Sequence, residues 1–241
     1  ARGQWRDRPR PILINNWEAT YFDFTEDKLV TIAEAAHKDG VELFVLDDGW
    51  FGARCSDFAG LGDWTPNRDR LPEGLASLAR RINGLGMQFG LWFEPEMVNK
   101  DSDLYRAHPD WIIHVPGRRE SHGRNQYVLD FSRPEVVDCI YDQMAKLLSG
   151  ANISYVKWDM NRSISEPFSE ALPPDRQGEL FHRYILGVYR LYERLTASFP
   201  HVLFESCSSG GGRFDPGMLY YAPQCWASDD SDAVERLKIQ Y

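Results

Sequence analysis

Short apolar runs alternate with longer segments of helical periodicity along the chain. The apolar runs predict seven strands, at residues 11–17, 41–48, 87–94, 126–131, 153–160, 202–206 and 224–228. Between them, apolar residues recur every three or four positions, as they do on the buried side of an α-helix. Strands that are apolar nearly throughout and are separated by helices are typical of a parallel sheet whose outer face is covered.

Local signals mark where several helices begin and end. Thr25 is a favourable N-cap, two acidic residues follow it in the first turn, and Gly40 provides a stop. Pro134 suits the first turn of another helix. Further apolar stripes predict helices at residues 75–85, 180–195, 214–220 and 233–241.

These elements predict an α/β fold, namely a (β/α)8 barrel of the TIM type that is truncated after its seventh strand. Seven β/α units in a row favour a closed barrel over a doubly wound sheet. No GxGxxG motif follows the first strand, which weakens the case for a dinucleotide-binding fold. We therefore expect residues 1–241 to form one barrel domain that lacks its eighth strand.

Charge and composition exclude several classes of function. The formal net charge of −9 argues against nucleic acid as a partner, since phosphate binding needs a surplus of Lys and Arg. No apolar run reaches the roughly 18 residues of a membrane span, and no apolar segment follows the basic N-terminus as in a secretory signal. Four irregularly spaced cysteines indicate reduced thiols and a cytoplasmic protein. Scattered histidines and the lack of a CxxC pair predict no metal and no cofactor.

The clearest chemical signal is that six of the predicted strands end in polar or charged residues and tryptophan. These ends read Asn15-Asn16-Trp17-Glu18, Asp47-Asp48-Gly49-Trp50-Phe51, Trp92-Phe93-Glu94-Pro95-Glu96, Lys157-Trp158-Asp159-Met160-Asn161, Glu205-Ser206-Cys207-Ser208-Ser209-Gly210 and Trp226-Ala227-Ser228-Asp229-Asp230. In a β/α barrel the C-terminal ends of the strands form the rim where the active site lies. Because clustered carboxylates repel one another and lower stability, six such endings on one rim indicate function.

Cleavage of a glycosidic bond suits such a rim, because it needs one carboxylate to attack the sugar and an acid to protonate the leaving oxygen. Lys157 precedes Asp159 by two residues, so we expect both side chains on the same face of their strand. The lysine would favour the ionised form of Asp159, which a nucleophile requires. The tryptophans fit a sugar site, since a pyranose face stacks on an aromatic ring, but core packing explains any single one equally well.

Several neighbouring residues keep more than one interpretation. The loop at residues 208–212 could cradle a phosphate, but no Lys-Ser/Thr pair follows it, which favours glycines that let the backbone approach a sugar. Cys207 could be a nucleophile, but without a His nearby in the sequence a packing role or a sugar contact is favoured. Glu94 and Glu96 could be rival catalytic groups, yet Pro95 between them indicates a turn that shapes the rim.

From about residue 11 to residue 241, and in the same order, the strand-end segments resemble those of the bacterial α-galactosidases of glycoside hydrolase family 36. Tyr155-Val156-Lys157-Trp158-Asp159-Met160-Asn161-Arg162 is similar to the nucleophile segment of that family, and Trp226-Ala227-Ser228-Asp229-Asp230-Ser231-Asp232-Ala233 to its acid/base segment. The resemblance implies that Asp159 is the nucleophile and Asp229 the acid/base. It also implies a retaining hydrolase that removes terminal α-linked galactose from oligosaccharides such as melibiose and raffinose.

The resemblance further implies which residues hold the sugar. Asp47 and Asp48 would bind O4 and O6 of galactose, and Lys157 and Asn161 would bind other ring hydroxyls. The pocket would be completed by Trp17, Trp92, Arg124, Cys207 and Gly210. Full-length members of the family add a large β-rich domain before the barrel and a small β domain after it, and they form homo-tetramers. Neither flanking domain is expected within residues 1–241.

Two other functions stay open. A galactosyl transferase such as a raffinose-type synthase, or an α-N-acetylgalactosaminidase, would use a similar barrel. The family resemblance implies that Cys207 and the small residues after it leave little room for an acetamido group at C2, which favours galactose. The second alternative is not an enzyme: the chain could be a non-catalytic sugar-binding fragment or a fragment unable to fold. The reason is that a barrel without its eighth strand has two unpaired sheet edges.

Overall fold

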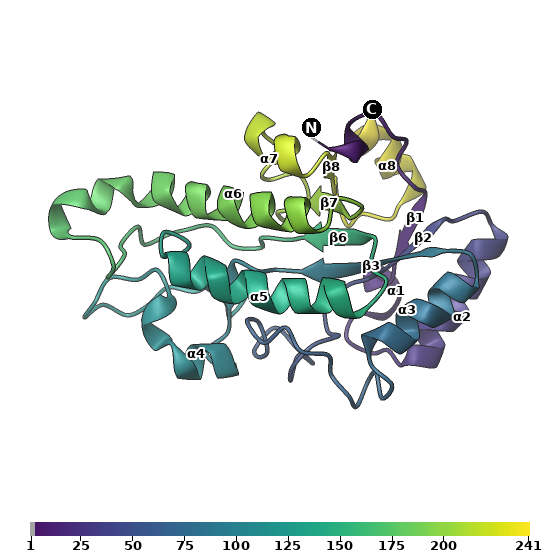
Figure 1. Cartoon of the computed structure of the whole chain (residues 1–241), viewed down its shortest axis with the longest axis horizontal. Helices are drawn as coiled ribbons and strands as arrows, with labels where there is room; N and C mark the ends of the chain where they lie inside the picture. Colours follow the sequence, from purple (N-terminus) through teal and green to yellow (C-terminus); the bar gives the residue numbers. More distant parts are fainter. Residues whose placement is uncertain (1–2) are drawn as a thin grey trace.

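A parallel sheet of six strands runs through the centre of the molecule (Figure 1). The computed structural model describes residues 3–241. In spatial order the strands are β1 (Leu13–Asn15), β2 (Leu43–Leu46), β3 (Gln88–Phe93), β6 (Tyr155–Trp158), β7 (Leu203–Ser206) and β8 (Gln224–Cys225). Every neighbouring pair is parallel. The sheet forms a half-barrel, and within the described residues β1 and β8 are its edge strands.

Helices connect the strands and cover the outer face of the sheet, as an all-parallel sheet requires. They are α2 (Glu26–Lys38), α3 (Leu75–Gly84), α5 (Pro134–Gly150), α6 (Leu180–Ser198) and α7 (Pro216–Tyr221). The helix α8 (Ala233–Gln240) follows the last strand and has no buried residue. Shorter helical segments are α1 (Trp17–Thr20), α4 (Asp103–Ala107) and the 3-10 helices η1 (Gln4–Arg6), η2 (Pro109–Trp111) and η3 (Pro174–Glu179). In Figure 1, α5 and α6 lie side by side along the sheet.

The predicted helices are confirmed, and so are their start signals. The hydroxyl of Thr25 accepts a hydrogen bond from the backbone N–H of Lys28, which satisfies one of the free donors at the start of α2. Pro134 occupies the first turn of α5, where its missing N–H costs nothing.

The fourth predicted strand, at residues 126–131, does not belong to the main sheet. Only Tyr127–Val128 (β5) is paired as a strand, and it lies antiparallel to Met97–Val98 (β4) in a separate two-stranded sheet. A parallel return to the main sheet needs a crossover that is usually a full helix, whereas only the short α4 and η2 lie between β4 and β5. The main sheet therefore has six strands instead of seven, so that an eight-stranded barrel needs two more.

Two strand boundaries also differ from the prediction. The first strand covers only Leu13–Asn15, because Trp17 opens α1. The last strand ends at Cys225 instead of residue 228, and the chain then bends away from the sheet.

Side chains on the strands alternate between two layers of the core, which decides where the polar strand ends point. On β2, Phe44 belongs to the large outer cluster under the helices, whereas Leu43 and Val45 join Tyr155 in a small inner cluster. Successive side chains on a strand point to opposite faces. Residues two positions beyond these inner ones, such as Asp47 and Lys157, therefore point toward the concave side, above the inner cluster.

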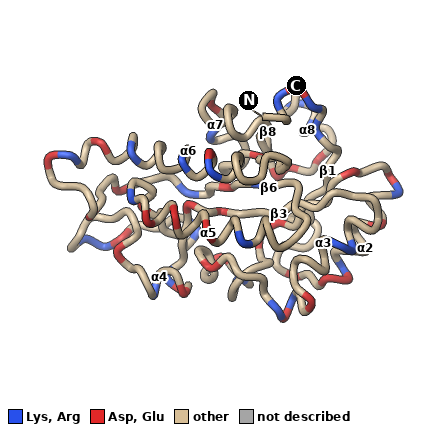
Figure 2. The backbone as a smooth tube through the Cα atoms, in the orientation of Figure 1, with Lys and Arg blue, Asp and Glu red and all other residues tan. Residues whose placement is uncertain are grey.

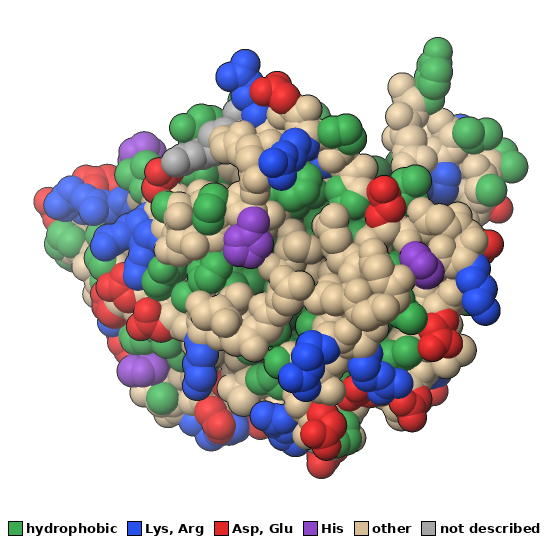
Figure 3. Space-filling model, turned by 45° about the vertical axis from the view of Figure 1, so that its right-hand side comes forward, with side chains coloured by type: hydrophobic (Ala, Val, Ile, Leu, Met, Phe, Trp, Pro, Cys, Tyr) green, Lys and Arg blue, Asp and Glu red, His purple; other side chains and the backbone are tan. Residues whose placement is uncertain are grey.

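The surface carries charges of both signs. Lys and Arg alternate with Asp and Glu along the outer helices and loops (Figure 2), and the face in Figure 3 mixes both signs with hydrophobic side chains. Neither view shows the broad basic surface that nucleic acid binding requires. Among residues 3–241, no helix has the length and apolar character needed to cross a membrane.

Candidate active site

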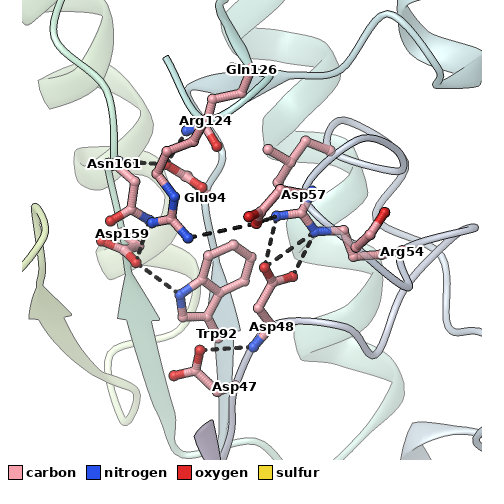
Figure 4. A network of polar contacts seen from close by, with 12 residues as sticks. Asp47, Asp48, Arg54, Asp57, Trp92, Glu94, Arg124, Gln126, Asp159 and Asn161 are labelled. Atoms are coloured by element: carbon pink, nitrogen blue, oxygen red, sulfur yellow. Dashed lines mark hydrogen bonds and ion pairs between the residues drawn. The ribbon is translucent and has the colours of Figure 1, made fainter. Parts of the chain in front are cut away.

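Asp159 lies directly after β6 and is held by three N–H donors. Its Oδ2 accepts hydrogen bonds from the indole of Trp92 at 3.1 Å and from the side chain of Asn161 at 2.7 Å (Figure 4). Its Oδ1 accepts one from the backbone N–H of Met160 at 2.9 Å. The residue is only 6% exposed. These donors match an ionised carboxylate and fix its orientation.

Lys157 and Asp47 form a buried ion pair beside Asp159. The ammonium Nζ of Lys157 donates to Asp47 Oδ2 at 2.8 Å, and both side chains are less than 5% exposed. Burial by itself would lower the pKa of Lys157, but the negative charge of Asp47, with smaller effects from Cys207 and Asp159, outweighs it and raises that pKa. The lysine therefore stays charged and contributes a fixed positive charge near Asp159.

Asp48 is bound by a residue that sequence reasoning missed. Arg54 reaches back from the loop after β2 and donates to both carboxylate oxygens of Asp48, at 2.8 Å and 3.0 Å for the shortest contacts (Figure 4). Arg54 is 1% exposed and is also held by Ala59 and Asn99. Burial raises the pKa of Asp48, and the guanidinium charge opposes that rise. A bidentate contact of this kind sets the orientation of the carboxylate.

Arg124 sits in a loop at the outer side of the same network. Its guanidinium lies 3.6 Å from Asp57, which itself lies 3.6 Å from Arg54 (Figure 4). Arg124 and the next residue, Asn125, both have positive φ angles, 52° and 60°. Residues other than glycine rarely have positive φ angles, and those that do cluster at ligand-binding sites.

Glu94 and Glu96 are both buried, and they face different partners. Glu94 accepts from Gln126 Nε2 at 2.6 Å and from the backbone N–H of Asn161. Glu96 accepts from the Trp158 indole and from Arg213, both at 2.8 Å. Glu96 is thus bound by Trp158 and Arg213, whereas Glu94 is bound next to Asn161, which itself contacts Asp159.

The loop after β7 places Cys207 and Gly210 against the same network. Cys207 is 2% exposed, and burial followed by the charge of Asp159 raises the pKa of its thiol, so it is not a thiolate nucleophile. Gly210 has a φ of +89°, and a Cβ there would lie 2.7 Å from the carbonyl oxygen of Ala227. Position 210 therefore requires glycine, because the Ala227 backbone lies too close to leave room for a side chain.

Asp229 lies on the other wall and is linked to the network through Trp226. The Trp226 ring faces the Lys157 ammonium at 4.5 Å, and its indole N–H donates to Asp229 at 2.7 Å. Asp229 and Trp17 line a cavity of about 490 Å³ between the two edge strands of the sheet. Asp159 is not among the residues that line this cavity.

The strand β8 ends at Cys225, before Asp229 and Asp230, and both of these aspartates line the cavity. Asp230 accepts from the backbone N–H of Asp232 and so orders the loop. Asp232 caps α8 by accepting from Val234 and Glu235.

Arg54 and Gln126 are the site residues that sequence reasoning did not find. Nothing local distinguishes Arg54 from a surface arginine, although it follows the Asp47-Asp48 pair by six residues. Gln126 falls within the strand predicted at residues 126–131, so its sequence position gave no sign of a site residue. Within residues 3–241, no group of three or more His, Cys, Asp or Glu side chains is arranged to hold a metal ion.

The arrangement joins a fixed carboxylate, a buried lysine, aromatic walls and a second carboxylate on the concave edge of a β/α half-barrel. A rim of this composition is typical of enzymes that act on sugars. The sequence matches the family model for melibiase over residues 1–241, and the chain belongs to that family.

The relatives are α-galactosidases several hundred residues longer. The chain is 64% identical over 241 residues to α-galactosidase AgaA of Geobacillus stearothermophilus, covering 100% of this chain and 33% of that protein. It is 56% identical over 240 residues to α-galactosidase Mel36A of Lactobacillus acidophilus, again covering 100% and 33%. The crystal structure of AgaA, a family 36 enzyme, superposes with a TM-score of 0.97 at 63% identity, covering 100% of this chain and 34% of that one.

This chain thus spans about a third of the length of the relatives that it matches. Variants of AgaA have been crystallised with raffinose and with stachyose. One carries an aspartate-to-asparagine substitution and the other an aspartate-to-alanine substitution.

Proposed function

We propose that this chain carries the active site of a retaining α-galactosidase that removes terminal α-linked galactose from oligosaccharides. The observation that carries the proposal is the environment of Asp159. Trp92, Asn161 and the backbone after β6 orient its carboxylate, and the Lys157–Asp47 pair lies beside it. A fixed, ionised carboxylate at the rim of a β/α barrel is what the first step of a double displacement requires.

In this mechanism Asp159 attacks the anomeric carbon and forms a glycosyl-enzyme, while Asp229 protonates the leaving oxygen. Asp229 then removes a proton from the water that breaks the intermediate, and α-galactose is released. Lys157, Asp47 and Asp48 bind ring hydroxyls through groups whose orientation the ion pairs already fix. The other residues that would bind the sugar are Trp17, Trp92, Arg124, Asn161, Cys207 and Gly210.

The relatives support the substrate class and the two aspartates. AgaA variants bind raffinose and stachyose, so we propose α-galactosides of this kind, melibiose included, as substrates here. The substituted aspartates of those two variants lie as many positions apart in their chain as Asp159 and Asp229 do in this one.

The proposal extends to the complete protein. Two further strands would pair with β1 and β8 and close an eight-stranded barrel. We also propose flanking β domains, a homo-tetramer and a cytoplasmic location. The location is supported by cysteines at positions 55, 139, 207 and 225 that are all free thiols.

Azide rescue of two alanine variants tests the proposal. Asp159→Ala should lose turnover by on the order of 10⁴-fold or more, because it removes the nucleophile. Azide should restore part of the turnover and yield β-galactosyl azide, since the small anion enters from the vacated face. In Asp229→Ala, azide should intercept the glycosyl-enzyme and yield the α-azide. Both products are identified by proton NMR.

Asp23→Ala is the matched control, because the Asp23 side chain is 99% exposed and lies outside the network. It should leave turnover unchanged. An α-azide from Asp159→Ala would exchange the two assignments, and β-galactose as the first product of the unmodified enzyme would exclude retention.

A further inference from the structure

Glu94 is a buried carboxyl group that the proposed mechanism does not use. It follows β3 two residues after Trp92, so both side chains point to the concave side of the sheet. The residue is 1% exposed. In Figure 4 its carboxyl group lies between Gln126 and the Asn161 segment, close to Asp159.

Two hydrogen bonds connect Glu94 to the nucleophile through one residue. Its Oε1 accepts from the backbone N–H of Asn161, and the Asn161 side chain donates to Asp159 Oδ2 at 2.7 Å. Gln126 holds the same oxygen from the opposite side at 2.6 Å. The position of Glu94 therefore determines where Asn161, and with it one oxygen of Asp159, can lie.

The charged groups that face Glu94 are Asp159, from the end of β6, and Arg54, from the loop after β2. The hydrogen bonds of Arg54 go to Asp48, Ala59 and Asn99, so this cation is engaged elsewhere. Both donors to Glu94 are uncharged amides. Two adjacent buried carboxylates cannot both ionise without a large cost when no cation is paired with the second one.

We propose that Glu94 is a positioning residue that works in its neutral, proton-bearing form, fixing Asp159 through Asn161 and allowing negative charge to return to Asp159 when the glycosyl-enzyme breaks down. The inference rests on the proposed function. In the second step the bond between Asp159 and the anomeric carbon breaks, its electron pair returns to the Asp159 carboxylate, and water supplies the new oxygen. A neutral neighbour favours that return, whereas an ionised one opposes it.

The pH range over which Glu94 is neutral in the free enzyme follows from its surroundings. Burial, reinforced by the charge of Asp159, raises the pKa of Glu94 from 4.5 to about 8. The neutral form is therefore present below about pH 8 and is lost as the pH rises through that value. The raised pKa values of Lys157 and Cys207 keep both residues in one protonation state over this range.

Infrared difference spectroscopy on the complete natural protein tests the protonation state without needing turnover. A carboxylic acid band should be present at neutral pH, disappear as the pH rises through about 8, and be missing in Glu94→Gln. In Asp159→Asn, which removes the neighbouring charge, the midpoint should move to lower pH. Absence of the band at neutral pH, or a midpoint that Asp159→Asn leaves unchanged, would overturn the inference. The second variant keeps the test decisive even if Glu94→Gln does not fold.

The kinetic test uses α-galactosyl fluoride, whose leaving group needs little protonation, so that breakdown of the glycosyl-enzyme limits kcat. Asp229 acts there as a base, so this step does not need a proton from Asp229. In the glycosyl-enzyme Asp159 is an uncharged ester, so Glu94 should lose its proton there below the value of about 8 that applies to the free enzyme. The kcat of the unmodified protein should therefore fall with rising pH at a midpoint below about 8, and Glu94→Gln should lose that fall. An identical fall in the variant would refute the positioning role. No turnover of the unmodified protein at any pH would refute the proposed function. The infrared measurement would still test whether Glu94 is protonated.

Discussion

At the scale of single residues, the site depends on charges that are buried in pairs. Lys157 and Asp47 are removed from water together, and each is the main compensation for the other. A buried pair of this kind adds little net stability over a hydrophobic pair of the same shape, but removing one partner leaves an uncompensated charge. The ion pair therefore orients the Lys157 and Asp47 side chains, and loss of either partner destabilises the fold.

Replacing Lys157 with methionine tests that dependence. The variant should lose about 3–5 kcal/mol of unfolding free energy near neutral pH, because Asp47 stays buried without a cation. Urea denaturation gives the value. Lys28→Met is the control, since the Lys28–Asp23 pair is exposed at the surface, and it should cost less than about 1 kcal/mol. Equal losses in the two variants would contradict the structural role of the buried pair.

At the scale of elements, close backbone approach decides how the helices pack. Gly187 lies in the middle of α6 and is buried, and a Cβ at this position would come within 1.9 Å of the carbonyl oxygen of Phe131. Phe131 belongs to the segment that follows β5. The glycine therefore lets α6 rest directly on that segment, which leads from the second, antiparallel sheet into α5.

Gly187→Ala should push α6 away from this segment and destabilise the fold by about 1–3 kcal/mol, the usual cost of overpacking a core. Thermal unfolding followed by circular dichroism measures the loss. Gly84→Ala is the matched control, because Gly84 is also helical and a Cβ there would meet no atom within 4 Å. That change should be neutral or stabilise by up to about 1 kcal/mol. A Gly187→Ala variant as stable as Gly84→Ala would contradict the packing described here.

At the scale of the whole molecule, the half-barrel leaves surfaces that a closed barrel would cover. Among residues 3–241, strands β1 and β8 each have one unpaired side, and the cavity of about 490 Å³ lies between them. Beyond it, Val234 and Leu237 on α8 are 62% and 72% exposed. Unpaired strand edges and exposed apolar residues favour association between molecules.

Extending the chain by the two strands of the proposed complete barrel should therefore raise its unfolding temperature, reduce self-association and increase turnover of p-nitrophenyl α-galactoside. The physical reason is that both sheet edges become paired and the wall that carries Asp229 is supported. The control is an extension of equal length made of Gly and Ser, which adds no strand. Size-exclusion chromatography and the turnover assay compare the three proteins. Equal behaviour of the two extended chains would show that barrel closure is not what the isolated chain lacks.

The sequence by itself determined the local elements and the face on which the chemistry lies. Capping at Thr25, the proline that opens α5 and the apolar runs depend on residues close together in the chain. Spacing by two residues likewise predicts that Lys157 and Asp159 share a face, because alternation is a property of the strand itself.

Only the tertiary structure decided which segments meet. Tyr127–Val128 has the composition of a sheet strand, but its partner, Met97–Val98, lies outside the main sheet. Arg54 is buried because Asp48, Ala59 and Asn99 converge on it, and nothing near it in the sequence records that convergence. Pairing and burial depend on contacts between residues that are distant in the chain, and a pattern of local hydrophobicity carries no information about those contacts.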